Sequence, residues 1–228
     1  MSDKAVYIIA ANHSWYESLR PFLSKRIDAD FIYIGQESDL SFERLKDLNP
    51  QCVFFTHWSN KIPVEIYENF ECIIFHMTDV PFGRGGSPLQ NLISRGIYET
   101  RMSALRCTSV LDGGPVYLKE AMSLHGTAEE IYIRASKLIG RMIEFIIINK
   151  PSPVEQVGEV ITFPRRKPED GNIEQLKDIE QVFDFIRMLD AEGYPRAFIE
   201  TERFRFEFQR PSLKAGKVVA DVIITEKG

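Results

Sequence analysis

The chain has 228 residues, of which 44% are hydrophobic and 27% are charged, and its formal net charge is −5 at pH 7. This balance is typical of a globular protein with a buried core, long enough for one large domain or for an ordinary domain with an appendage. Binding along a phosphate backbone needs clustered Lys and Arg, so the acidic balance argues against nucleic acid as a partner. One or two local cations could still hold a small phosphate-bearing molecule.

The N-terminal apolar stretch, Ala5 to Ala10, is too short for the hydrophobic part of a secretory signal. No other stretch is long enough to cross a bilayer, so no membrane partner is expected. Cys52, Cys72 and Cys107 have no C-x-x-C spacing, and two of them begin apolar runs. We therefore predict reduced core thiols in a cytoplasmic protein.

Four short apolar runs in the first half of the chain predict buried strands. Each run is rich in β-branched or aromatic residues, and they cover residues 6–9, 31–34, 53–55 and 73–75. Continuous apolarity indicates strands that are covered on both faces, as in a parallel sheet. Stretches with helical spacing lie between them, at 14–26, 39–48 and 63–69. This alternation predicts a doubly wound, mostly parallel α/β sheet that binds ligands at the carboxyl ends of its strands.

The pattern changes after residue 86. It predicts a helix at 87–94, strands at 101–109 and 114–123, and a long helix over 127–149. Pro151-Ser152-Pro153 is the clearest boundary, so we expect one domain over residues 1–150 and a small mixed α+β extension over 151–228. The extension is expected to begin with a short strand, followed by a loop at 164–171, a helix at 173–189 and a strand-rich tail at 197–225. Phe204, Phe206 and Phe208 alternate in that tail and are expected to face the core.

The stretch from Phe75 to Pro88 carries the strongest chemical signal. It places His76 at the end of a predicted strand and Arg84 in a glycine-rich loop. Asp112 stands on a later glycine turn that leads into another strand. An Asp before Gly is ordinary turn chemistry by itself, but a His beside a carboxylate can move protons in an acyl transfer. We predict that His76 and Asp112 share one pocket.

Two other kinds of site find no support in the sequence. The four His residues lack metal-ligand spacing, so no metal is expected. The chain has neither the glycine pattern of dinucleotide-binding proteins nor that of P-loop proteins.

The stretch around His76 resembles the 10-formyltetrahydrofolate-dependent formyltransferases. That family carries Asn-x-His-x-Ser-Leu-Leu-Pro-x-x-Arg-Gly-x-x-Pro at this point of its sheet, and Asp-x-Gly later. The residues that match this pattern are His76, Thr78, Pro81, Arg84, Gly85, Pro88, Asp112 and Gly114. Two further segments, 165–171 and 193–198, are similar to those of the branch that formylates nucleotide-linked amino sugars. The resemblance covers roughly residues 50 to 200 and implies a Rossmann-like domain.

The resemblance also implies roles for individual residues. His76 and Asp112 would be catalytic, with Asp112 orienting His76 and accepting a proton from the attacking amine. Thr78, Arg84 and Gly85 would contact the substrate. A further segment would hold the folate, and its residues are Trp58, Ser59, Asn60, Lys61 and Ile62. The formyl donor would be 10-formyltetrahydrofolate, with no metal.

One position departs from the family pattern. The family's Asn, two residues before the His, falls on Ile74, which cannot donate a hydrogen bond to an oxyanion. Either Asn60, Thr78 or a backbone N–H supplies the donor, or activity is low, or the protein binds without catalysing.

Several functions therefore stay open at this point. The first is transfer of a formyl group to a nucleotide-linked amino-deoxy sugar for surface or flagellar glycan synthesis. Methionyl-tRNA and glycinamide ribonucleotide are alternative acceptors on the same fold. The rivals from other classes are a catalytically impaired folate- or nucleotide-sugar-binding protein and a hydrolase that deformylates the same folate. The sequence names neither the sugar nor the nucleotide and leaves a homodimer open.

Overall fold

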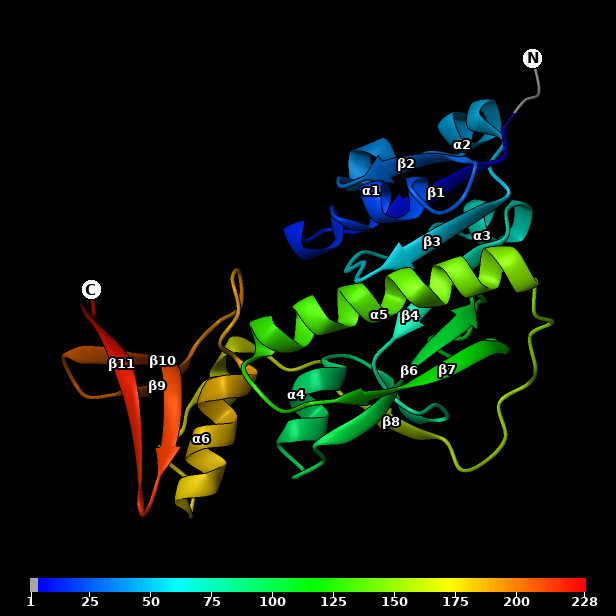
Figure 1. Ribbon diagram of the computed structural model, residues 1–228. Coiled ribbons are helices and arrows are strands. Elements are labelled where there is room, and N and C mark those ends of the chain that lie inside the picture. Colours follow the sequence, from blue (N-terminus) through cyan, green and yellow to red (C-terminus); the bar gives the residue numbers. More distant parts are fainter. Residues whose placement is uncertain (1–3) are drawn as a thin grey trace. The chain divides into compact units, whose positions relative to one another are not determined.

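The computed structural model describes residues 4–228. Its main feature is a six-stranded sheet with strand order β2-β1-β3-β4-β6-β7 (Figure 1). The first four strands run parallel, and β6 is antiparallel to β4. The strands of this sheet are β1 (Val6–Ala10), β2 (Asp30–Ile34), β3 (Cys52–Thr56), β4 (Cys72–His76), β6 (Glu99–Arg106) and β7 (Val116–Ser123). The predicted doubly wound α/β class is confirmed.

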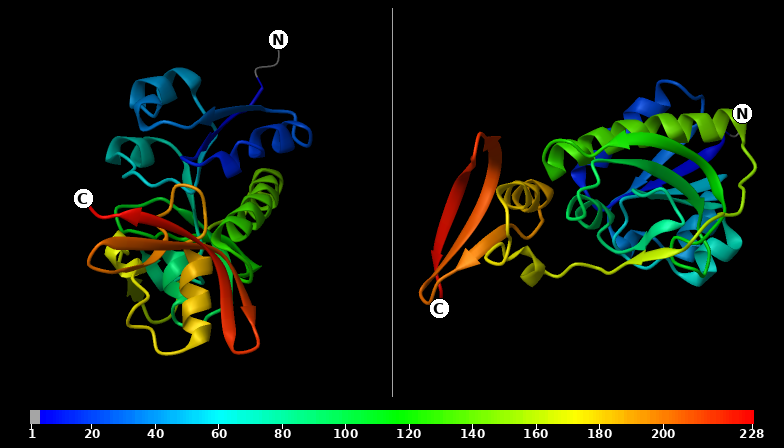
Figure 2. Two further views of the ribbon diagram at one scale, coloured as in Figure 1. Left: turned by 90° about the vertical axis from the view of Figure 1, so that its left-hand side faces the viewer. Right: turned by 90° about the horizontal axis from the view of Figure 1, so that it is seen from below.

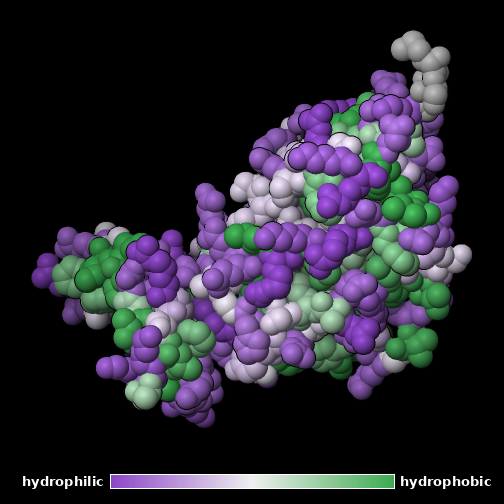
Figure 3. Space-filling model, viewed as in Figure 1, coloured by the Kyte–Doolittle hydropathy of each residue, from purple (hydrophilic) through white to green (hydrophobic). Residues whose placement is uncertain are grey.

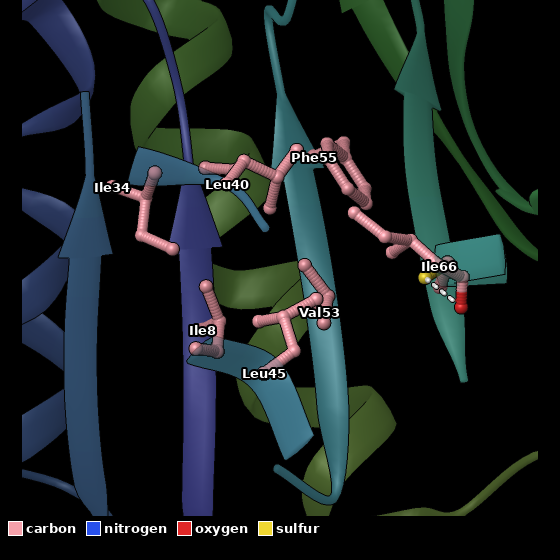
Figure 4. Close-up of a cluster of buried hydrophobic side chains, with 9 residues drawn as sticks. Ile8, Ile34, Leu40, Leu45, Val53, Phe55 and Ile66 are labelled. Atoms are coloured by element: carbon pink, nitrogen blue, oxygen red, sulfur yellow. Dashed lines mark hydrogen bonds between the residues drawn. The ribbon is translucent and has the colours of Figure 1, made fainter. Parts of the chain in front are cut away.

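Helices cover both faces of this sheet. They are the 3-10 helices η1 (Ser14–Tyr16) and η2 (Glu37–Asp39) and the α-helices α1 (Leu19–Ser24), α2 (Phe42–Leu48), α3 (Val64–Asn69) and α5 (Ala128–Asn149). On one face α5 packs on α1, because an added Cβ at Gly140 would lie 3.1 Å from side-chain atoms of Leu19 and Phe22. On the other face, side chains from α2 and α3 meet those of the strands, as Figure 4 shows for Leu45, Ile66 and Phe55. The apolar runs of the strands are thus buried from both sides.

Contacts divide the chain into two compact units that interleave along the sequence. The first contains the residues up to Arg84 together with Arg101–Met122 and Ile133–Thr162. The second contains Gly85–Thr100, Ser123–Tyr132 and Phe163–Gly228. The predicted boundary near residue 150 stays a prediction.

The second unit combines helices with a small antiparallel sheet of order β11-β10-β9 (Figure 2). Its elements are α4 (Pro88–Ile93), η3 (Pro168–Gly171), α6 (Ile179–Met188), β9 (Ala197–Glu200), β10 (Phe204–Lys214) and β11 (Lys217–Glu226). The buried Arg187 of α6 donates from Nη1 to the carbonyls of Leu124 and Gly126, and from Nε to Asp184. These bonds satisfy a cation that burial would otherwise destabilise.

Some predicted elements need correction. The stretch 14–26 is not one helix but η1 followed by α1. The helix predicted from residue 173 begins only at Ile179, because the Asp178 side chain caps it by accepting from the Gln181 N–H. A short strand was missed at β5 (Phe82–Gly85), which pairs with β8 (Ile161–Phe163).

The C-terminal strands keep apolar side chains exposed (Figure 3). The expectation that three alternating phenylalanines face the core is wrong for Phe204, which is 39% exposed, whereas Phe206 and Phe208 are half-buried. The exposed apolar residues of β10 and β11 are Phe204, Leu213, Val219, Val222, Ile223 and Ile224. The three-stranded sheet is too small to bury all of its apolar positions.

Candidate active site

The carboxyl ends of the parallel strands bring polar side chains together in the first unit. His76 is the last residue of β4, and Asp112 lies in the turn between β6 and β7. β6 runs antiparallel to β4, with Ser103 opposite His76 and Arg106 opposite Ile73, so the β6–β7 turn begins near the start of β4 and folds back to bring Asp112 to His76. The His76 Nδ1 atom lies 3.5 Å from Asp112 Oδ1, with side chains 8% and 10% exposed. The structure thus brings the two predicted catalytic residues together.

The hydrogen bonds of His76 define its tautomer. Its Nε2 lies 2.8 Å from the carbonyl oxygen of Gly83. A carbonyl oxygen only accepts, so Nε2 carries a hydrogen and donates it. The other ring nitrogen, Nδ1, faces the Asp112 carboxylate. A proton that enters this pair is therefore held between Nδ1 and Oδ1. Their separation is longer than a normal hydrogen bond, and such bonds often tighten when the substrate binds.

The loop after β4 is held by its own polar groups. The Thr78 hydroxyl donates to the same Gly83 carbonyl at 3.2 Å, and the Thr78 carbonyl accepts from the Ser103 hydroxyl at 2.7 Å. Thr78 and Ser103 are fully buried. Thr78 therefore supports the loop that fixes His76, and its single hydroxyl hydrogen is already used. The predicted substrate contact of Thr78 stays untested.

The Asp112 turn depends on glycine. Asp112 itself has φ of 49°, in the left-handed region that Asp tolerates better than most residues. A Cβ added at Gly114 would lie 1.9 Å from the Arg106 carbonyl oxygen, which is an impossible contact. Only glycine lets the turn approach the end of β6 this closely, which explains the physical need for the Asp-x-Gly pattern.

Arg84 is held by Gln156, a residue that no pattern in the sequence singles out. Its Nε and Nη2 atoms donate to Gln156 Oε1 at 3.0 and 2.8 Å. Gln156 in turn donates from Nε2 to the carbonyls of Asp112 and Gly114, at 2.9 and 2.8 Å. Arg84 and the Asp112 turn are therefore connected. Gly85, by contrast, belongs to the second unit, whereas the other predicted site residues belong to the first.

The predicted folate segment follows β3, next to β4 in the sheet. Trp58 and Ile62 pack against the same apolar cluster as Ile74, and Lys61 is exposed. The Ser59 N–H donates to Asn12 Oδ1 at 2.8 Å, which joins the loops after β1 and β3. Among residues 4–228, the indole N–H of Trp58 is buried and has no hydrogen-bond partner. It is a donor with unused capacity.

Two candidate oxyanion donors at this edge are already engaged. Asn60 donates from Nδ2 to Glu37 Oε2 at 2.8 Å, and Thr78 donates to Gly83 as described above. The Ile74 side chain packs into the apolar cluster. Of the donors considered from the sequence, the Thr78 hydroxyl is fully used, whereas a backbone N–H and the second N–H of Asn60 Nδ2 stay available.

Aromatic side chains gather at the ends of β1 and β3. The rings of His13 and His57 lie 4.4 Å apart, and His13 stacks on Trp15 at 4.9 Å. Burial, with a smaller contribution from His13, lowers the pKa of His57 to about 3. His57 is thus a neutral imidazole in the folded protein at neutral pH.

The cysteines are free thiols, as expected. Burial raises the pKa of Cys52 and Cys72, and it raises that of the half-buried Cys107 to about 11. Within residues 4–228 no group of three or more His, Cys, Asp or Glu side chains could hold a metal ion. No helix in that part of the chain is both long and apolar enough to span a bilayer.

Together these features define an α/β protein with a His–Asp pair at the carboxyl edge of its sheet. A structure titled methionyl-tRNA formyltransferase from Clostridium thermocellum is 47% identical, with a TM-score of 0.95 over 98% of this chain and 100% of that one. The methionyl-tRNA formyltransferase of Thermodesulfovibrio yellowstonii is 25% identical over 177 residues, which is 74% of this chain and 58% of that protein.

Two further comparisons concern the C-terminal part and the fold. The family of the methionyl-tRNA formyltransferase C-terminal domain matches residues 168–225. A sugar N-formyltransferase from a Shewanella species shares the fold at 14% identity, with a TM-score of 0.68 over 95% of this chain and 96% of that one. The chain belongs to the formyltransferase family. It spans about half the length of the methionyl-tRNA formyltransferase sequences that it matches.

Proposed function

We propose that the protein transfers a formyl group from 10-formyltetrahydrofolate to an amine. The observation that carries the proposal is the His76–Asp112 pair, 3.5 Å apart and buried at the carboxyl edge of the sheet. Acyl transfer to an amine needs a group that takes a proton at the moment of attack. A folate also fits the site, because Trp58 holds a buried donor without a partner beside a partly apolar surface.

In this reaction the folate supplies the formyl carbon. The amine forms a new C–N bond to that carbon, and the bond between the carbon and the folate nitrogen breaks. Asp112 and the Nδ1 atom of His76 take the proton that the amine loses, and they return it to the departing nitrogen. Gly83 keeps the imidazole in the tautomer that leaves Nδ1 free for this task, because its carbonyl accepts from Nε2.

The acceptor amine is proposed to be that of methionyl-tRNA. Support comes from the relatives of this name, one of them 47% identical over the whole length of its solved chain, and from the C-terminal match at 168–225. This acceptor was an alternative to the nucleotide-linked sugar in the sequence analysis, and the comparisons favour it.

A nucleotide-linked amino sugar stays the second candidate because of charge. The segment 168–225 has twelve acidic and eight basic residues. Five of the eight basic residues, all arginines, already form ion pairs: Arg187, Arg196, Arg203, Arg205 and Arg210. Few cations in this segment are left for a tRNA backbone, whereas one or two phosphates of a small acceptor need only a local cation such as Arg84.

One competition assay tests both the reaction and the acceptor. The full chain is incubated with 10-formyltetrahydrofolate and equal concentrations of methionyl-tRNA and a panel of nucleotide-linked amino sugars, and mass spectrometry reports which amine gains a formyl group. We expect formyl-methionyl-tRNA to accumulate. If only a nucleotide-linked sugar gains a formyl group, the acceptor is the second candidate and not methionyl-tRNA. Release of formate without any formylated amine would favour a hydrolase.

A further inference from the structure

Gln156 uses its whole amide group to connect two parts of the candidate active site. Its oxygen accepts two hydrogen bonds from the Arg84 guanidinium, at 2.8 and 3.0 Å. Its nitrogen donates two, at 2.9 and 2.8 Å, to the carbonyls of Asp112 and Gly114. These four bonds join segments that are more than 40 residues apart in the sequence. The next residue, Val157, is 88% exposed, so the loop faces solvent there whereas the Gln156 side chain is hydrogen-bonded within the protein.

We propose that Gln156 is a positioning residue that holds Arg84 and the Asp112 turn in one geometry while leaving the charge of Arg84 free for an anionic acceptor. This inference rests on the proposed function. A carboxylate in the same place could hold the guanidinium equally well, but it would neutralise the cation and could not donate to the two carbonyls. A neutral amide does both tasks.

The geometry also leaves part of Arg84 for a ligand. A guanidinium has five N–H groups, and Gln156 uses one on Nε and one on Nη2. The Nη1 atom lies on the side of the Asp112 turn, because a Cβ added at Gly113 would be 3.2 Å from it. Arg84 therefore lies alongside the turn that carries the proposed proton acceptor. A phosphate bound to its remaining N–H groups would place the acceptor near that carboxylate.

Two substitutions separate the roles of Gln156. Gln156→Met removes all four hydrogen bonds and leaves Arg84 charged, whereas Gln156→Glu keeps the contact to Arg84 but cancels its charge. We expect both variants to lower kcat, because both lose the donors to the Asp112 turn. We expect Gln156→Glu to raise the KM for the acceptor about 10-fold or more, and more than Gln156→Met does, because only the glutamate cancels the Arg84 charge that would bind an anionic acceptor. The KM for 10-formyltetrahydrofolate should stay within about 2-fold.

The same substitutions in an Arg84→Ala background form the decisive control. If Gln156 acts on the acceptor through Arg84, the difference in acceptor KM between Glu and Met at position 156 should vanish there. A residue that only stabilises the fold would lower the melting temperature and the active fraction without this selective effect. Val157→Ala is the matched control and should behave as wild type.

An NMR measurement separates this inference from the proposed function. In the full chain the Arg84 Nε proton should exchange slowly and lose that protection in Gln156→Met, whether or not the enzyme finds its acceptor. Wild-type turnover with equal acceptor KM in Gln156→Glu and Gln156→Met would overturn the inference alone. An unprotected Arg84 Nε proton in the wild-type protein would overturn it as well. A wild-type protein without turnover on any amine would overturn the proposed function instead.

Discussion

Removing the proton acceptor of the candidate site should abolish most of the activity while leaving the fold intact. Asp112→Asn keeps the shape of the side chain, which is 10% exposed. Its amide group can donate to His76 Nδ1 but cannot take the proton of the attacking amine. We expect turnover to fall about 100-fold or more, the usual effect of a positioned acid–base group. This corresponds to about 2.7 kcal/mol of lost transition-state stabilisation.

His76→Asn tests the other half of the pair. An asparagine is too short to donate to the Gly83 carbonyl and to face Asp112 at the same time, as the imidazole does. We expect a loss similar to that of Asp112→Asn. The double variant should cost little beyond the worse single variant, because groups that act as a unit are not additive.

The assay is single-turnover formation of the formylated amine, read by mass, with melting temperatures measured in parallel. A melting temperature close to that of the wild-type protein shows that the loss is chemical. Wild-type turnover in either single variant would refute the assignment, and so would two losses that simply multiply in the double variant.

Three further predictions follow from the same structure. Arg84→Ala should raise the KM for the acceptor much more than that for the folate, and a defect confined to folate binding would contradict this. Acceptor binding by the wild-type protein should weaken steeply with salt if the acceptor is tRNA, and only slightly if it is a nucleotide sugar. Trp58→Phe should weaken folate binding about 3- to 10-fold, as expected for one lost hydrogen bond, and an unchanged folate affinity in a binding titration would exclude the indole as a donor. The wild-type protein should turn over at a measurable rate, so that Ile74→Asn is not required for activity. The pKa of His57 falls from 6.5 to about 3 on folding, so the unfolded chain binds this proton first and the free energy of unfolding should fall as the pH drops from about 6.5 to about 3. Over this pH range the urea midpoint should fall less in His57→Gln than in the wild-type protein. An equal fall of the midpoint in both proteins would refute the argument.

The central sheet was predictable from local sequence. Runs such as Val53–Phe55 are apolar at every position, and both faces of a parallel strand are indeed buried here. The pairing of His76 with Asp112 was predictable from the resemblance to the family pattern, but not from topology, because β6 is antiparallel to β4 and the turn after it begins opposite Ile73, near the start of β4. The separation of 3.5 Å required the structure.

Other features have no local signal. β5 lies in a glycine-rich run with poor strand propensity, and its pairing with β8 depends on residues almost eighty positions later. Gln156 lies in an exposed stretch after Pro153, where glutamine is an ordinary solvent-facing residue, and its partner Arg84 is 72 residues away. Long-range hydrogen bonds of this kind are set by the tertiary fold, so no spacing rule could have selected this glutamine.

Formyl transfer by the wild-type chain is the most direct test of the central claim. The full chain is mixed with 10-formyltetrahydrofolate and either methionyl-tRNA or a nucleotide-linked amino sugar, and the mass of the amine and the amount of tetrahydrofolate are followed together. We predict that one amine gains a single formyl group for each tetrahydrofolate released, and that Asp112→Asn stops both. Tetrahydrofolate release without a formylated amine, or folate binding without any release, would contradict the account.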